Sequence, residues 1–201
     1  MCGYTYYFNT ELKKKINKKI LRDTLNLQRH RGPDISKWSN YKNSYFFHNR
    51  LKVIDLSNRA NQPMTDTEGN IILFNGEIYN YLDLKKKYNL KNLKTNWDTE
   101  VILSLYKKLG ENFVNKLNGI FSFLIFNKKK NQLFVARDRF GVKPLFYYLD
   151  KEKIIFSTEI KPILKLLKTY NINLKVISEY ISTGKYFHTN STFFEKIKIF
   201  P

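Results

Sequence analysis

The single cysteine of this chain, Cys2, directly follows the initiator methionine. Removal of Met1 would place a thiol and a free α-amine on one residue. Such an amine has a reference pKa of ~7.7–8.0 and a thiol one of ~8.5, so the amine can take the thiol proton near neutral pH. Cys2 is therefore a candidate N-terminal nucleophile, and chance placement is the alternative.

A second candidate is the Asn-Gly pair at Asn75 and Gly76, within "FNGEIYN". Asn75 has a short amide side chain, and a glycine lets its backbone come close to a ligand. The two could give N–H donors to an oxyanion that develops during acyl transfer. Taken alone, the pair is more typical of a plain turn between two strands.

Two charged residues could anchor a small zwitterion. Arg50 stands beside the apolar residues Leu51, Val53 and Ile54, and its planar fork suits a carboxylate; a solvated position at a strand end is the alternative. Asp98 in "WDTEVIL" is most simply the N-cap of a helix, or else a carboxylate that receives an ammonium group. His30 and His48 are interpreted as structural, since no Ser/Asp constellation surrounds them.

Two arginine-rich turns complete the set of motifs. "RHRGPD" at 29–34 places charges around a rigid Gly-Pro turn, and "ARDRFGVKPLFYY" at 136–148 has the same character. For both we predict buried ion pairing that shapes the turn.

The composition restricts the class of protein. The chain has 201 residues, 42% of them hydrophobic, which suits one domain over 1–201 with a substantial core. The formal charge of +19 is the balance of 36 basic residues, seven arginines and 29 scattered lysines, against 17 acidic ones. This pattern predicts weak adhesion to polyanions and no specific nucleic-acid partner. No nucleotide-binding glycine motif and no Cys/His metal spacing occur, so neither a cofactor nor a metal is expected here.

The same features indicate a compartment. A lone cysteine cannot form an internal disulfide and suits a reducing cytoplasm. No apolar run reaches the ~20 residues that span a bilayer, and polar residues follow the N-terminus too soon for a signal peptide. We therefore expect a cytoplasmic protein without membrane association.

The elements that must position these residues are separate blocks of strands and helices. Strands are predicted at 3–8, 43–49, 52–55, 71–75, 119–127, 132–137, 145–150 and 153–157, and helices at 11–27, 81–88, 98–109, 159–168 and 174–182. This order favours an α+β fold with antiparallel sheets over βαβ winding.

Taken in order, these motifs resemble a known family. "RHRGPD", "HNRLKVIDLSNRANQPM", "FNGEIYNY", "DTEVIL", "NGIFSFLIFN", "ARDRFGVKPLFYY" and "FSTEIKPIL" follow Cys2-Gly3 across essentially the whole chain. The string resembles the glutaminase, or class II glutamine amidotransferase, domain of B-type glutamine-hydrolysing asparagine synthetase. The resemblance implies the N-terminal-nucleophile hydrolase fold, an αββα sandwich of two antiparallel sheets between helical layers. It also implies hydrolysis of L-glutamine to glutamate and ammonia for asparagine synthesis.

The resemblance assigns roles to particular residues. Cys2 would be the nucleophile, with its own α-amine as the base, and Asn75 and Gly76 would hold the oxyanion. Arg50 would bind the α-carboxylate, and Glu77 and Asp98 would receive the α-ammonium. The backbone of four residues would line the same pocket: Leu51, Lys52, Val53 and Ile54.

The chain also departs from the family. Trp97 stands before Asp98 where a small residue is expected, and its indole would either narrow the pocket or pack beside it. The family's chains continue into a synthetase domain with an SGGxDS loop, which this sequence does not contain. ATP and magnesium are implied only for that domain, which would be a partner that accepts ammonia, and a homodimer is a further expectation. Apolar residues near the C-terminus would need its cover: Phe193, Phe194, Ile197 and Phe200. The alternative is a catalytically silent domain used in interaction or regulation.

Overall fold

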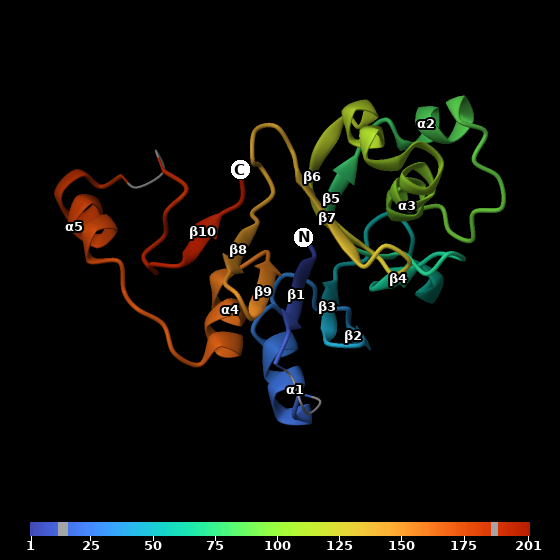
Figure 1. Cartoon of the computed structure of the whole chain (residues 1–201). Helices are drawn as coiled ribbons and strands as arrows, with labels where there is room; N and C mark the ends of the chain where they lie inside the picture. The colour runs from blue at the N-terminus through green and yellow to red at the C-terminus, as the bar shows by residue number, and fades with distance from the viewer. Residues whose placement is uncertain (12–15, 186–188) are drawn as a thin grey trace.

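The computed structural model describes residues 1–11, 16–185 and 189–201. The described residues form two antiparallel sheets (Figure 1). The first has the strand order β10-β8-β9-β1-β3-β2. Its strands are β1 (Gly3–Asn9), β2 (Ile35–Tyr41), β3 (Ser44–Arg50), β8 (Phe146–Leu149), β9 (Lys153–Ser157) and β10 (Ile197–Ile199).

The second sheet has the order β4-β5-β6-β7. Its strands are β4 (Met64–Thr65), β5 (Ile71–Ile78), β6 (Gly119–Asn127) and β7 (Gln132–Arg137). In the central pair, Gly76 lies opposite Phe121 and Asn75 lies opposite Ser122. The end of β5 therefore carries the predicted oxyanion residues in extended backbone.

Helices cover the outer face of each sheet. Helices α1 (Lys18–Asn26) and α4 (Ile160–Leu167) lie by the first sheet, and α2 (Tyr81–Lys87) and α3 (Asp98–Leu109) by the second, as Figure 1 shows. The 3₁₀ segments η1 (Asn58–Ala60) and η2 (Gly110–Lys116) lie in connections, and α5 (Leu174–Thr183) stands at one end of the molecule.

Three apolar layers follow from this arrangement. Side chains that alternate along each strand point to opposite faces of the sheet, so each strand contributes to two layers. Tyr4, Phe46 and Leu124 are buried between the sheets. Ile72 and Phe123 pack on the α3 side, and the outer face of the first sheet packs against α1 and α4. The sequence-based prediction of an αββα sandwich is confirmed.

Several predicted elements differ from the structure. Residues 52–55 are a loop, and Val53 is 58% exposed, so the apolar run there is not a buried strand. Strands β2, β4 and β10 were not predicted, because β2 is mostly polar and exposed and the other two are very short. The helix predicted over 11–27 begins at Lys18 among the described residues, and residues 12–15 lie outside them.

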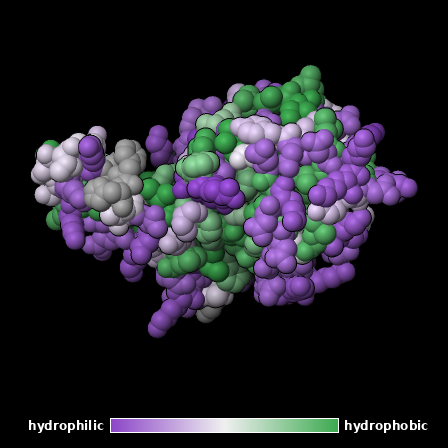
Figure 2. Space-filling model, turned by 90° about the horizontal axis from the view of Figure 1, so that it is seen from above, coloured by the Kyte–Doolittle hydropathy of each residue, from purple (hydrophilic) through white to green (hydrophobic). Residues whose placement is uncertain are grey.

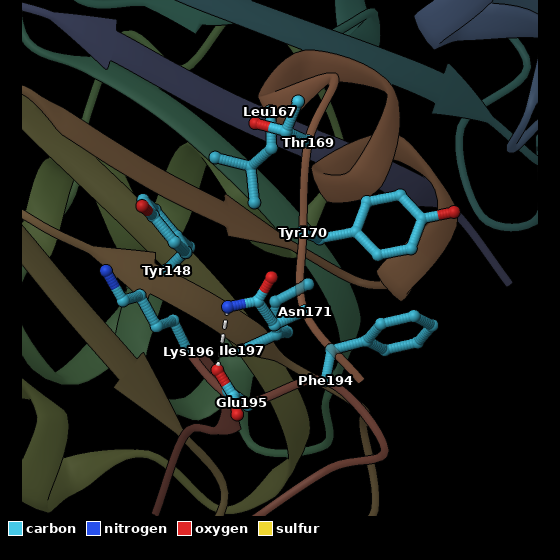
Figure 3. Close-up of a pocket in the computed structure, with 9 residues that line it drawn as sticks. All are labelled: Tyr148, Leu167, Thr169, Tyr170, Asn171, Phe194, Glu195, Lys196 and Ile197. Atoms are coloured by element: carbon cyan, nitrogen blue, oxygen red, sulfur yellow. Dashed lines mark hydrogen bonds between the residues drawn. The ribbon is translucent and has the colours of Figure 1, made fainter. Parts of the chain in front are cut away.

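The C-terminal apolar residues are better covered than predicted. Ile197 is 1% exposed, because β10 pairs with β8, and Phe193, Phe194 and Phe200 are half-buried. Beside Ile197 lies a small pocket of about 200 Å³, shown in Figure 3, where Asn171 donates to Glu195 at 3.1 Å. The exposed apolar residues of this region lie instead around α5, where Leu174 is 75% exposed.

The surface is mixed in character. Hydrophobic patches interrupt the hydrophilic residues on the face seen in Figure 2. Among the described residues, no helix combines the length and apolar character that a membrane crossing requires. Over the same residues, no cluster of three or more His, Cys, Asp or Glu side chains could hold a metal ion.

Candidate active site

Cys2 is held at the entrance to β1. The Leu51 N–H points to Sγ at 3.4 Å, and the Cys2 carbonyl accepts a hydrogen bond from Arg31 Nε at 3.1 Å. Arg31 also contacts Glu159 at 3.4 Å, so this arginine links Cys2 to the turn before α4. Burial raises the pKa of the Cys2 thiol, while the Leu51 N–H opposes the shift. The thiol therefore needs a base to react near neutral pH.

The chain before Cys2 is accessible. Met1 is 53% exposed, and its Sδ accepts a hydrogen bond from Lys143 Nζ at 2.9 Å. Burial lowers the pKa of the α-amine that Met1 carries, with a further contribution from the charge of Arg31. Because burial disfavours the charged form of an amine, more of this amine is unprotonated near neutral pH.

Asn75 is buried with its amide unengaged. It is 1% exposed, and neither its Oδ1 nor its Nδ2 has a hydrogen-bond partner among the described residues. Buried polar atoms in folded proteins nearly always have partners, so such an amide indicates a place for a ligand group. A Cβ at Gly76 would lie 2.3 Å from the Ile120 carbonyl oxygen, which requires glycine at this position.

A residue that the sequence interpretation missed fixes this part of β5. Gln62 accepts a hydrogen bond from Phe74 N at 2.6 Å and donates one to Phe74 O at 3.3 Å. His48 Nε2 contacts the same carbonyl at 3.3 Å, and burial lowers the pKa of His48 to about 3, so its ring is neutral. These contacts join β3 to β5 beside Asn75 and confirm the structural interpretation of His48. A buried glutamine has no sequence signal that would have revealed it.

Arg50 ends β3 as a fully buried cation, with 0% exposure. Its Nη1 donates to Ser57 O and to Asn61 Oδ1, each at 2.7 Å, and its Nη2 donates to Asp55 O. Burial lowers the pKa of this guanidinium, which remains protonated because its ordinary pKa is so high. The alternative of a solvated Arg50 therefore does not hold, because the side chain at this strand end is buried.

Asp98 is the first residue of α3, not its N-cap. Its Oδ2 accepts a hydrogen bond from Ile78 N at 2.9 Å, which ties the helix to β5. Asp98 is 0% exposed, and burial, with the nearby charge of Glu77, raises its pKa to about 7. Burial also raises the pKa of the half-buried Glu77, against the charge of Lys143. For both carboxyls, burial therefore disfavours the charged form.

The loop at residues 51–54 makes its contacts near Cys2 through backbone atoms. Lys52 N donates to Asp34 Oδ2 at 2.7 Å, so the carboxylate of the "RHRGPD" motif holds this loop. Leu51 and Lys52 are half-buried, whereas Val53 and Ile54 are 58% and 39% exposed. Of these four residues, only Leu51 has a backbone contact with Sγ.

The second arginine-rich turn is shaped mainly by bonds to backbone. Asp138 accepts four backbone N–H groups at 2.9–3.2 Å, those of Phe121, Phe140, Val142 and Lys143. Arg137 donates to three carbonyls, those of Lys143, Gly141 and Phe200. Its Nη1 bond to Phe200 fastens the C-terminal segment at the same loop. The predicted ion pairing is replaced here by bonds to the main chain.

Comparison with known proteins decides the family. The family model described as a glutamine amidotransferase domain matches residues 1–201. This chain belongs to that family. It is 41% identical over 197 residues to the putative asparagine synthetase [glutamine-hydrolyzing] 2 of Methanocaldococcus jannaschii, covering 85% of this chain and 38% of the relative. It is 35% identical over 195 residues to asparagine synthetase [glutamine-hydrolyzing] 1 of Bacillus subtilis, covering 90% of this chain and 29% of the relative. This amidotransferase domain thus spans well under half the length of these relatives.

Solved structures agree on the fold. A glutamine phosphoribosylpyrophosphate amidotransferase from B. subtilis, complexed with ADP and GMP, superposes with a TM-score of 0.65 at 17% identity, over 85% of this chain and 45% of that one. At this identity the likeness shows the shared fold alone.

Proposed function

We propose that this amidotransferase domain hydrolyses L-glutamine to glutamate and ammonia through a Cys2 thioester, and that the ammonia serves ATP-dependent asparagine synthesis. The observation that carries the proposal is the buried, unpartnered amide of Asn75, in a chain whose Cys2 thiol is also buried and lies within reach of the charges of Arg50 and Asp98. The asparagine synthetase names of its relatives support the destination of the ammonia.

The first step forms the thioester. Once Met1 is removed, the α-amine of Cys2 takes the thiol proton, and the thiolate attacks the side-chain amide carbon of glutamine. Asn75 Nδ2 and the Gly76 N–H stabilise the oxyanion, which is worth ~10²–10³ in rate for each donor. Collapse of the tetrahedral intermediate breaks the C–N bond, and the protonated α-amine gives its proton to the leaving ammonia. Water then attacks the thioester, and its cleavage returns the proton to Cys2 and releases glutamate.

Substrate recognition uses two buried charges of opposite sign. The α-carboxylate binds Arg50, and the α-ammonium binds Asp98 with Glu77 beside it. Because a site with unpaired buried polar groups strongly rejects analogues that lack the partner group, both charged groups on the α-carbon of the substrate are required. The Leu51 N–H, 3.4 Å from Sγ, holds the thiol in place.

The remaining expectations concern a partner. Aspartate activation, with its ATP and magnesium, would belong to a synthetase domain or subunit that receives the ammonia. We assign no cofactor to the amidotransferase domain itself. A homodimer remains a further expectation from the resemblance.

The test measures glutamate release from L-glutamine by purified protein whose intact mass shows loss of Met1. We expect turnover in the wild type, none in Cys2→Ala, and a severe loss in Cys2→Ser, which keeps the amine and replaces the thiol. Turnover that survives Cys2→Ala would refute the mechanism. A folded, processed chain without turnover would favour the silent-domain alternative.

A further inference from the structure

An aromatic ring lies directly against the candidate carboxylate-binding arginine. Trp97 immediately precedes α3, is 3% exposed, and its ring centroid lies 4.3 Å from Cζ of Arg50. A guanidinium in this position over an aromatic face gains cation–π attraction, which grows when water is excluded. The same contact shields the guanidinium from solvent.

The stacked pair has buried donors without acceptors. Arg50 Nε and Trp97 Nε1 have no hydrogen-bond partner within the described residues. Three of the five Arg50 N–H groups are used by Ser57, Asn61 and Asp55. The Nε–H and one Nη2–H remain, and these nitrogens form one edge of the guanidinium. That edge fits a carboxylate as a two-pronged fork.

We propose that Trp97 is a specificity-determining residue of the α-carboxylate subsite. Its ring is the platform on which the Arg50 guanidinium lies, and its indole N–H donates to the same carboxylate that Arg50 binds. The stack uses the face of the guanidinium and leaves the edge free for substrate. This inference rests on the proposed glutamine site and adds a residue to it.

Hydrogen bonds fix the segment before α3, which carries Trp97. Glu100 accepts hydrogen bonds from Lys94 N, Thr95 N and Thr95 Oγ1 at 2.7–2.9 Å. Asn96 N donates to Asp55 Oδ2 at 3.1 Å, and the carbonyl of Asp55 accepts from Arg50. The ring and the guanidinium are therefore fixed by one connected set of contacts.

A purely structural tryptophan predicts a different behaviour. If Trp97 only fills space, its replacement lowers stability and affects all substrates alike. If it belongs to the carboxylate subsite, its replacement weakens binding of substrates that carry the α-carboxylate and spares those that do not. The choice of substrate therefore separates the two roles.

The experiment compares Trp97→Phe and Trp97→Ser with wild type, using L-glutamine and its α-amide, in which the carboxylate is replaced by a neutral group. Trp97→Phe keeps the platform and loses the N–H, whereas Trp97→Ser loses both. For L-glutamine we expect KM to rise about tenfold in Trp97→Phe and 10–100-fold in Trp97→Ser, with kcat within about threefold, since a hydrogen bond to a charged group contributes ~1.5–3 kcal/mol. The KM for the α-amide should change less than about threefold. Trp38→Phe is the matched control, because Trp38 is the other tryptophan and is 44% exposed on β2.

Three results would overturn the inference: an unchanged KM for glutamine in Trp97→Ser, equal rises of KM for both substrates, or a loss of kcat and stability alone. If the wild type releases no glutamate, the proposed function fails separately. The same comparison is then made on binding, with calorimetric dissociation constants of the Cys2→Ala chain for both compounds. Because Trp97→Phe keeps an aromatic ring in the core, a folding failure of Trp97→Ser does not remove the test.

Discussion

Replacement of Asp98 by asparagine should stabilise the protein while abolishing its use of glutamine. The carboxyl has an ordinary pKa of 3.8 and is raised to about 7, first by burial and then by the charge of Glu77. Asp98→Asn removes the charge, and its amide oxygen can still accept the hydrogen bond from Ile78 N. The folded state then no longer contains an uncompensated buried carboxylate.

The magnitude follows from the size of the pKa shift. The difference of roughly three pH units corresponds to at most about 4 kcal/mol, at about 1.36 kcal/mol per unit. A carboxyl whose pKa is raised on folding binds protons more tightly in the folded state between its two pKa values. Wild-type stability therefore falls as pH rises from about 4 to 7, and the penalty is complete above pH 7. The advantage of Asp98→Asn should be greatest at pH 8 and absent below pH 4.

The assay is thermal unfolding of both proteins from pH 4 to pH 8, with glutamate release measured in parallel. A gain of about 1 kcal/mol would raise Tm by ~2–4 °C in a protein of this size. Asp83→Asn, which removes an exposed carboxylate on α2, is the charge-matched control and should leave the pH dependence unchanged. An Asp98→Asn protein that is less stable than wild type at pH 8, or whose difference from it does not vary with pH, would refute the reasoning.

Three other substitutions test the site and its supports. Asn75→Ala should lower kcat for glutamine by ~10²–10³ with little change in KM, as steady-state kinetics would show. Gln62→Ala leaves the Phe74 N–H unpaired and should cost ~1–3 kcal/mol in denaturant unfolding, whereas Gln132→Ala, at an exposed position, should cost almost nothing. Burial raises the pKa of Asp138, but four backbone N–H groups outweigh it and hold the pKa below its ordinary value. Asp138→Asn should therefore be less stable than wild type at pH 7, with the difference shrinking as pH falls below about 4.

The sequence indicates residues whose proposed role needs a particular chemical group. It indicates much less about the residues that hold the backbone around them in place. Cys2 could be proposed because a terminal thiol next to an α-amine suggests chemistry before any contact is known. Asn75 and Gly76, more typical of a plain turn when taken alone, are assigned through the resemblance. Gln62 could not, because its role depends on the position of one backbone unit of β5. A side chain that binds backbone leaves no pattern in a single sequence.

Burial explains the specific errors. Val53 and Ile54 are apolar, and the sequence predicts a strand for them. In the structure they lie in a loop, and both side chains are exposed. Arg50 is charged, which by itself favours a solvated position, yet the guanidinium is buried and two carbonyls of the loop after β3 accept hydrogen bonds from it. Both differences have one cause. The hydrophobicity of a residue does not predict its burial where the local backbone is held by other contacts, as in the loop at 51–54 and around Arg50.

The raised pKa of the buried Asp98 carboxyl predicts that binding of glutamine releases a proton. Without a ligand Asp98 titrates near pH 7, so about half of the molecules carry its proton at that pH. The ammonium of glutamine favours the charged carboxylate and must lower this pKa, so binding expels the proton. Calorimetry of L-glutamine with the Cys2→Ala chain, in buffers of different ionisation enthalpy, should show release of nearly one proton per glutamine at pH 6 and almost none at pH 8.5. Binding should weaken correspondingly as pH falls below 7. Proton release that does not vary between these pH values, or that persists in Asp98→Asn, would mean that another group receives the ammonium.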